Sequence, residues 1–154
     1  MLPQINNFID LFKKLDYDMK RYKQNNHIYE LIDCFMTINA LPEWIIKSSE
    51  ASDNLKKAAK EKIKIMKGEN NFVFDETKLE DINHKLILVR LLCNHSKHKT
   101  NSTQIPTIKS QMGTTLPFTF PGKFDYIIAI GKVNIDAEYI LNDLKNFWES
   151  ELEK

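Results

Sequence analysis

The residues best suited to chemistry lie between positions 88 and 100, in the segment LVRLLCNHSKHKT. An apolar run carries one arginine, Arg90, and is followed by an asparagine, two histidines and two lysines. A guanidinium can hold phosphate oxygens bidentately and keeps its proton. A histidine titrates near neutrality, so it can take a proton from a ribose 2′-hydroxyl and return one to the leaving oxygen. The segment is therefore suited to bind a phosphodiester and to cleave it without a metal.

Helical geometry places most of these polar residues on one face. At about 100° per residue, Asn94, Lys97 and His98 share an arc of about 100° with Arg90. We expect Arg90 and His98 to be catalytic. The phosphate- or RNA-binding residues expected around them are Asn94, Lys97 and Lys99.

The other histidine of the segment falls on a different face. His95 lies about 140° from Arg90 on the same helical wheel, beside Leu88 and Leu92. It is the alternative catalytic residue, and it would become the base if the helix unwound before Ser96.

Two other roles for the segment stay open. Cys93, His95 and His98 include metal-ligand types, but Cys93 and His98 point about 140° apart on the wheel. A structural zinc site needs four convergent ligands, so we expect neither a metal nor a cofactor. Arg90 could instead pair with an acid such as Asp33 across a helix interface, with the following cations placed favourably at a helix C-terminus.

The segments that must position these residues have helical apolar spacing. This spacing predicts a first helix to about Tyr22 and a second one capped by the asparagines at 25–26, with a break near Ala40 because of Pro42. Trp44 and Trp148 lie in apolar stripes and are expected to be buried. The N-caps expected for the three later helices are Asp53, Asp75 and Asp136.

In the last third of the chain the spacing of apolar residues changes from that of a helix to that of a strand. The polar composition of residues 99–116 predicts a long loop before this change. The segments TLPFTF and KFDYIIAIGKV, joined by Pro121 and Gly122, predict a β-hairpin. The expected fold class is mainly α, a helical bundle with a small β-hairpin before the C-terminal helix, in one domain over residues 1–154.

Composition narrows the classes of function. Lys and Arg number 22 against 21 Asp and Glu, so the formal charge is only +1 and any basic site must be local. No apolar run approaches the roughly 20 residues of a membrane helix, and the N-terminus does not resemble a signal peptide. Cys34 and Cys93 lie in apolar helical patterns, which predicts reduced core cysteines in a cytoplasmic protein.

Six lysines crowd residues 56–67. A lysine-rich outer face is ordinary for an amphipathic helix. The alternative is a track for a phosphate backbone.

The segment around Arg90 also resembles the HEPN superfamily of small helical proteins. That superfamily has an arginine and a histidine separated by four to six residues, late in a bundle helix. Arg90 and His95 fit this spacing, and His98 exceeds it by one residue. The layout is similar to bacterial HEPN-like proteins with an R…N…KH helix end, since CFMTINALPEWI precedes it and a hairpin and a final helix with Trp148 follow it.

The resemblance implies a metal-independent endoribonuclease that acts as a homodimer, with the Arg and His of both subunits facing one cleft. Many members belong to toxin–antitoxin or phage-defence systems, which implies an antitoxin or another protein partner. Other members are non-catalytic modules, so the alternative is binding of a nucleotide, an anion or a protein. The residue after the arginine is often polar in the nucleases, whereas here it is Leu91.

Overall fold

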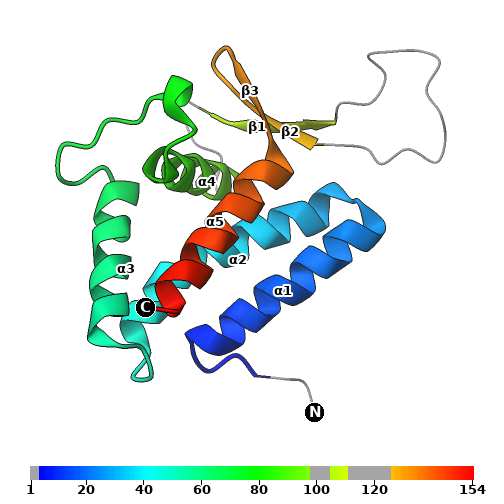
Figure 1. The fold of residues 1–154 in the computed structure, drawn as a ribbon. Coiled ribbons are helices and arrows are strands. Elements are labelled where there is room, and N and C mark those ends of the chain that lie inside the picture. The colour runs from blue at the N-terminus through cyan, green and yellow to red at the C-terminus, as the bar shows by residue number, and fades with distance from the viewer. Residues whose placement is uncertain (1–3, 98–104, 111–125) are drawn as a thin grey trace.

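The computed structural model describes residues 4–97, 105–110 and 126–154, and it is mainly helical (Figure 1). The expected mainly α class is confirmed, with a small antiparallel sheet before the last helix. In chain order the elements are α1 (Phe8–Asn25), α2 (Ile28–Lys47), α3 (Asp53–Met66), the 3₁₀ helix η1 (Glu76–Lys78), α4 (Ile82–Lys97), β1 (Thr107–Ser110), β2 (Tyr126–Ile130), β3 (Val133–Asp136) and α5 (Ala137–Leu152).

The first two helices form a hairpin with a very short connection. Asn26 adopts a left-handed conformation with φ of 52°, and its N–H donates to the carbonyl of Tyr22. An asparagine tolerates this conformation, which ends α1. His27 then caps α2 by accepting a hydrogen bond from the N–H of Tyr29 at 3.1 Å. The expectation that the asparagines cap α2 is therefore wrong by one residue.

The predicted break near Ala40 is also wrong. Helix α2 runs from Ile28 to Lys47 with Pro42 inside it. A proline removes one intrahelical hydrogen bond and crowds the preceding turn, which weakens a helix unless packing compensates. Here α2 contacts α1, α3, α4 and α5, and its residues Ile38, Leu41 and Ile45 are buried. The surrounding helices hold α2 together across the proline.

The caps of α3 and α5 follow ordinary side-chain chemistry. Ser52 caps α3 by accepting from the N–H of Leu55 at 3.1 Å, so Asp53 is the first helical residue rather than the cap. Asp136 caps α5 by accepting from the N–H of Tyr139 at 3.1 Å, as predicted.

The start of α4 differs from the prediction. Asp75 caps the short helix η1, where its carboxylate accepts from the N–H of Thr77 at 2.9 Å. The same carboxylate accepts from the Thr77 hydroxyl, and these bonds lower the pKa of Asp75. Asp81 lies immediately before α4 and accepts from the N–H of Asn83 at 2.7 Å. Asp75, which was predicted to cap α4, is therefore separated from α4 by the short helix η1.

The core is shared by all five α-helices and by the middle strand. Trp148 is fully buried, as predicted, whereas Trp44 is only partly buried against the core. Cys34 and Cys93 are buried and free, and burial raises the pKa of the Cys34 thiol to about 12. A thiol with such a pKa is a packing residue and not a nucleophile at neutral pH.

The sheet lies at one end of the helices, beside the start of α5 (Figure 1). Its strands pair antiparallel in the order β1-β2-β3, and Ile128 of β2 opposes Ile108 and Ile135. Gly131, with φ of 57°, lies in a turn that divides the run expected to form one strand into β2 and β3. Strand β3 ends at Asp136 and leads directly into α5. Strand β1 occupies part of the segment expected to be a loop.

The other half of the predicted hairpin, TLPFTF with Pro121 and Gly122, lies outside the described residues. Across the part of the chain that the structure describes, no helix is long and apolar enough to span a membrane.

Candidate functional site

Helix α4 passes through the middle of the protein before it becomes accessible. It contacts α2, α3 and α5, and the six successive residues 84–89 are all buried. Six consecutive residues cover every direction around a helix, so α4 is enclosed over this stretch. From Arg90 onward some of its side chains are partly exposed. The polar cluster predicted from the sequence therefore begins where α4 leaves the core.

Arg90, Asn94 and His95 are the predicted site residues whose side chains the structure places. Arg90 and Asn94 are one turn apart on α4, and both are partly buried. Neither side chain forms a hydrogen bond or an ion pair within residues 4–97, 105–110 and 126–154. In particular, the structure shows no ion pair between Arg90 and Asp33, and Asp33 is exposed. A partly desolvated guanidinium without a carboxylate has unused donors for an anion.

Helix α4 does not unwind before Ser96, which was the condition under which His95 would replace His98 as the base. The backbone of α4 is helical through Ser96 and Lys97. His95 is partly buried, and its neighbours Leu92 and Cys93 are buried. This agrees with the predicted separation of His95 from the face of Arg90.

The remaining members of the cluster are His98, Lys99 and the side chain of Lys97, and they lie outside the described residues. The structure therefore brings Arg90 and Asn94 together as predicted, and the positions of the other three stay predictions. Among the described side chains no group of three or more His, Cys, Asp or Glu residues could hold a metal ion.

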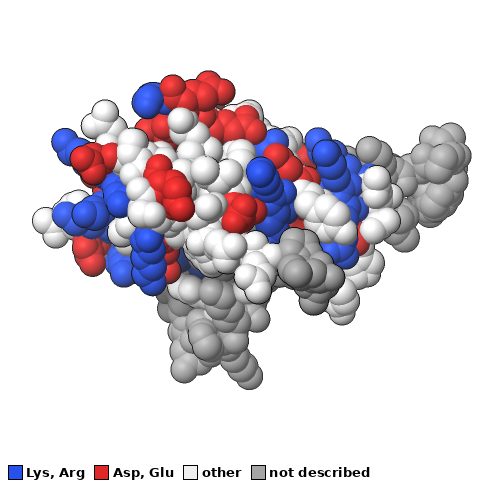
Figure 2. All heavy atoms as spheres, turned by 90° about the horizontal axis from the view of Figure 1, so that it is seen from below, with Lys and Arg blue, Asp and Glu red and all other residues white. Residues whose placement is uncertain are grey.

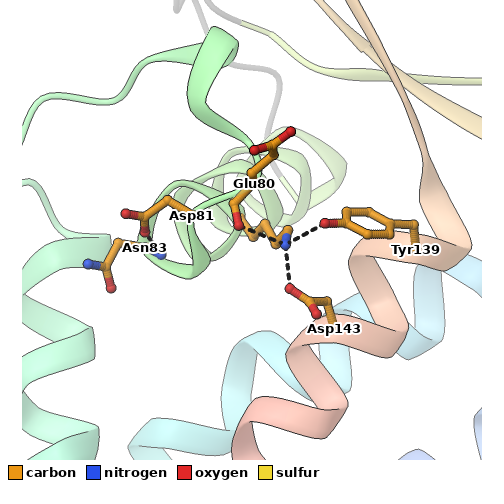
Figure 3. Close-up of polar contacts among 6 residues, drawn as sticks. Glu80, Asp81, Asn83, Tyr139 and Asp143 are labelled. Carbon is orange, nitrogen blue, oxygen red and sulfur yellow. Dashed lines mark hydrogen bonds and ion pairs between the residues drawn. The ribbon is translucent and has the colours of Figure 1, made fainter.

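A second polar cluster surrounds a buried lysine near the start of α4. The sequence analysis did not identify it. Lys85 is only 1% exposed, and its ammonium donates to the carbonyl of Glu80 at 3.2 Å and to the Tyr139 hydroxyl at 3.0 Å (Figure 3). Its third bond goes to the carboxylate of Asp143. All three donors of the ammonium are thereby satisfied, and the contacts link α4 to α5.

The charge of Lys85 is stabilised by these contacts. Burial alone lowers the pKa of an ammonium, but the hydrogen bonds to Asp143 and Tyr139 and the charge of Asp143 outweigh it, so the pKa of Lys85 is raised. Because the folded-state pKa is raised, this contribution to stability is complete below the unfolded pKa of about 10.4 and is lost as the pH rises through the folded-state value. Lys85 is therefore a charged link between helices rather than a neutral nucleophile.

We expect Asp143→Asn to lower the free energy of unfolding by about 1–3 kcal/mol at pH 7, because a buried ammonium loses a charged hydrogen-bond partner. The half-exposed Asp143 keeps the loss below the 3–5 kcal/mol typical of fully buried pairs. Urea denaturation would measure it.

Asp16→Asn is the matched control for that change. Asp16 is 45% exposed, close to the 42% of Asp143, but its partner Lys145 is 24% exposed instead of 1%. Lys145 also keeps its ion pair with Glu149 at 3.2 Å, so loss of the Asp16 charge should cost less than about 1 kcal/mol. Equal losses in the two variants would contradict the special role of the buried ammonium.

A groove of about 770 Å³ runs along α1 and is also lined by Asp33 of α2. Lys14, in its wall, donates to Asp18 at 2.5 Å and to Thr37 at 2.9 Å. Arg21, also in the wall, pairs with Glu30 at 3.4 Å. The wall as a whole holds three cations (Lys13, Lys14 and Arg21) and three carboxylates (Asp10, Asp18 and Asp33), so the groove offers less to an anion than the end of α4 does.

Comparison of the chain with protein-family models, with curated proteins and with solved structures found no match. The assignment of a function therefore depends on the geometry and the chemistry of the site itself.

Proposed function

We propose that the C-terminal end of α4 binds RNA and that the protein cleaves it as a metal-independent, HEPN-like endoribonuclease acting as a homodimer. The observation that carries the proposal is Arg90, a partly buried guanidinium with no carboxylate partner among the described residues. A phosphodiester supplies the charge and the paired oxygens that such a group binds best.

Each polar residue of the cluster has a role in this proposal. Arg90 binds the scissile phosphate and stabilises the charge that develops on it. His98 transfers protons to and from the ribose and the leaving oxygen, with His95 as the alternative. The supporting phosphate ligands are Asn94, Lys97 and Lys99.

Wild-type protein is expected to cut single-stranded RNA in excess EDTA and to leave 2′,3′-cyclic phosphate ends, because no metal takes part in the proposed chemistry. Mass spectrometry of the products would identify the ends. Cleavage that disappears on addition of EDTA and returns with a divalent cation would contradict the proposal.

A non-catalytic module is the second candidate, and Leu91 favours it. The residue that follows Arg90 is apolar and partly buried, where the resembling nucleases often carry a polar one. In that case the same end of α4 binds RNA, a nucleotide or another anion without cutting it. Binding that depends on Arg90, in a protein that cleaves no RNA, would favour the module.

A further inference from the structure

The outer face of α3 carries a row of exposed lysines. We name this row, formed by Lys57, Lys60 and Lys64 of α3 and by its C-cap Lys67, the α3 lysine face. At about 100° per residue the four share an arc of about 80°. The opposite side of the helix holds Leu55, Ala59 and Met66, which are buried. The packing of α3 therefore fixes the direction in which the lysines point.

The charges of this face are not neutralised within the part of the chain that the structure describes. No ion pair involves any of the four lysines there, whereas Lys14, Lys85 and Lys145 all have carboxylate partners. The acids of α3 are Asp53, in the first turn, and Glu61, beside the face.

Like charges three and four residues apart destabilise a helix, and a surface that serves solubility alone usually mixes both signs. Residues 53–69 hold six lysines and three acids, which gives this segment a formal charge of +3 in a chain whose net charge is only +1. Figure 2 shows Lys and Arg side chains at the α3 end of the molecule, at the left of that view, with Asp and Glu side chains among them and further Lys and Arg toward the right. An anionic partner would remove the repulsion.

The length of the row suits a nucleic-acid strand. Lys57 and Lys67 are ten residues apart, which corresponds to about 15 Å along a helix. A strand in a duplex carries one phosphate per about 3.4 Å of axis, so about four phosphates lie alongside four lysines. Charge and spacing together favour a polyphosphate backbone over a compact anion.

The face is also joined firmly to the helix of the candidate site. Lys62, on the inner side of α3, donates to the side-chain oxygen of Asn83 in α4 at 2.8 Å and lies 5.3 Å from the ring centre of Phe147 in α5. RNA held on α3 is thereby held on an element that packs directly against α4.

We propose that the α3 lysine face binds the RNA phosphate backbone and supplies sequence-independent affinity beyond the end of α4. This inference rests on the proposed RNA-binding function and adds to it an extended track. The track would make RNA binding strongly dependent on salt, because each neutralised phosphate releases a counterion.

The test compares two variants of the full chain that lose the same charge. One replaces the four lysines of the face with glutamine, which preserves helix propensity. The control replaces Lys20, Lys23, Lys47 and Lys132, which are also exposed. The probe is a labelled 2′-O-methyl RNA of about 20 nucleotides, which the proposed chemistry cannot cleave. Fluorescence anisotropy at several salt concentrations gives the affinity and its salt slope.

We expect the α3 variant to bind at least tenfold more weakly than the control at about 100 mM salt. Its slope of log affinity against log salt should fall by up to about 3, at about 0.7 per phosphate on a single strand. Equal affinities and slopes in the two variants would overturn the inference, as would a wild-type protein that does not bind the RNA at about 50 mM salt.

The outcome is distinguishable from that of the proposed function. Cleavage by the wild type, combined with an α3 variant that behaves like the control, would refute the track and leave the nuclease standing. Weakened binding by the α3 variant, in a protein that neither cuts RNA nor needs Arg90 to bind it, would support the track and refute the site on α4.

Discussion

Replacing His98 with alanine is expected to lower the rate of RNA cleavage by about 10²–10⁴-fold, because that is the usual contribution of a positioned proton-transfer group. The fold should be unaffected, as judged by the melting curve. His95→Ala is the matched control. Helix α4 remains regular through Lys97, which turns His95 about 140° from Arg90, so this variant should retain most of its activity.

Single-turnover cleavage by the two histidine variants would decide between them. Loss of activity in His95→Ala alone would make His95 the base and would place the phosphate on another side of α4. Full activity in both variants would contradict histidine catalysis at this end of the helix.

Replacing Trp148 with alanine is expected to lower the free energy of unfolding by about 3–5 kcal/mol, the usual loss for a large aromatic side chain in a core. Trp148 is 0% exposed and lies among residues contributed by several helices. Trp44→Ala should cost clearly less, because Trp44 is only partly buried. Urea denaturation of both variants measures the two losses of unfolding free energy. Equal losses would contradict the difference in burial between Trp148 and Trp44.

Local patterns predicted most of the helices correctly. The apolar stripes of α1, α3 and α5 face the core as expected, and Asp136 caps α5. The errors occurred where distant residues outweigh local preference. Pro42 is retained inside α2 because four other helices pack around that helix. Strand β1 is short and polar, and it pairs with β2 from a segment whose composition predicts a loop.

In the candidate site, too, local geometry was predicted correctly and contacts between distant residues were not. Arg90 and Asn94 share a face as helical geometry predicts, since both lie on one regular helix. The Lys85 cluster could not be predicted, because Asp143 is 58 residues away in the sequence. The available signal was a lysine inside the apolar run of α4, because a lysine is almost never fully buried without a polar or charged partner.

The affinity of Arg90→Gln for uncleavable RNA tests the central claim most directly. Glutamine keeps much of the aliphatic stem and removes the guanidinium, and the melting curve shows whether the fold is retained. We predict binding about 10–100-fold weaker than that of the wild type, the range expected when charged hydrogen bonds are lost. A folded variant with unchanged affinity would contradict a phosphate site at the end of α4, and a variant that unfolds would show that Arg90 is a structural residue.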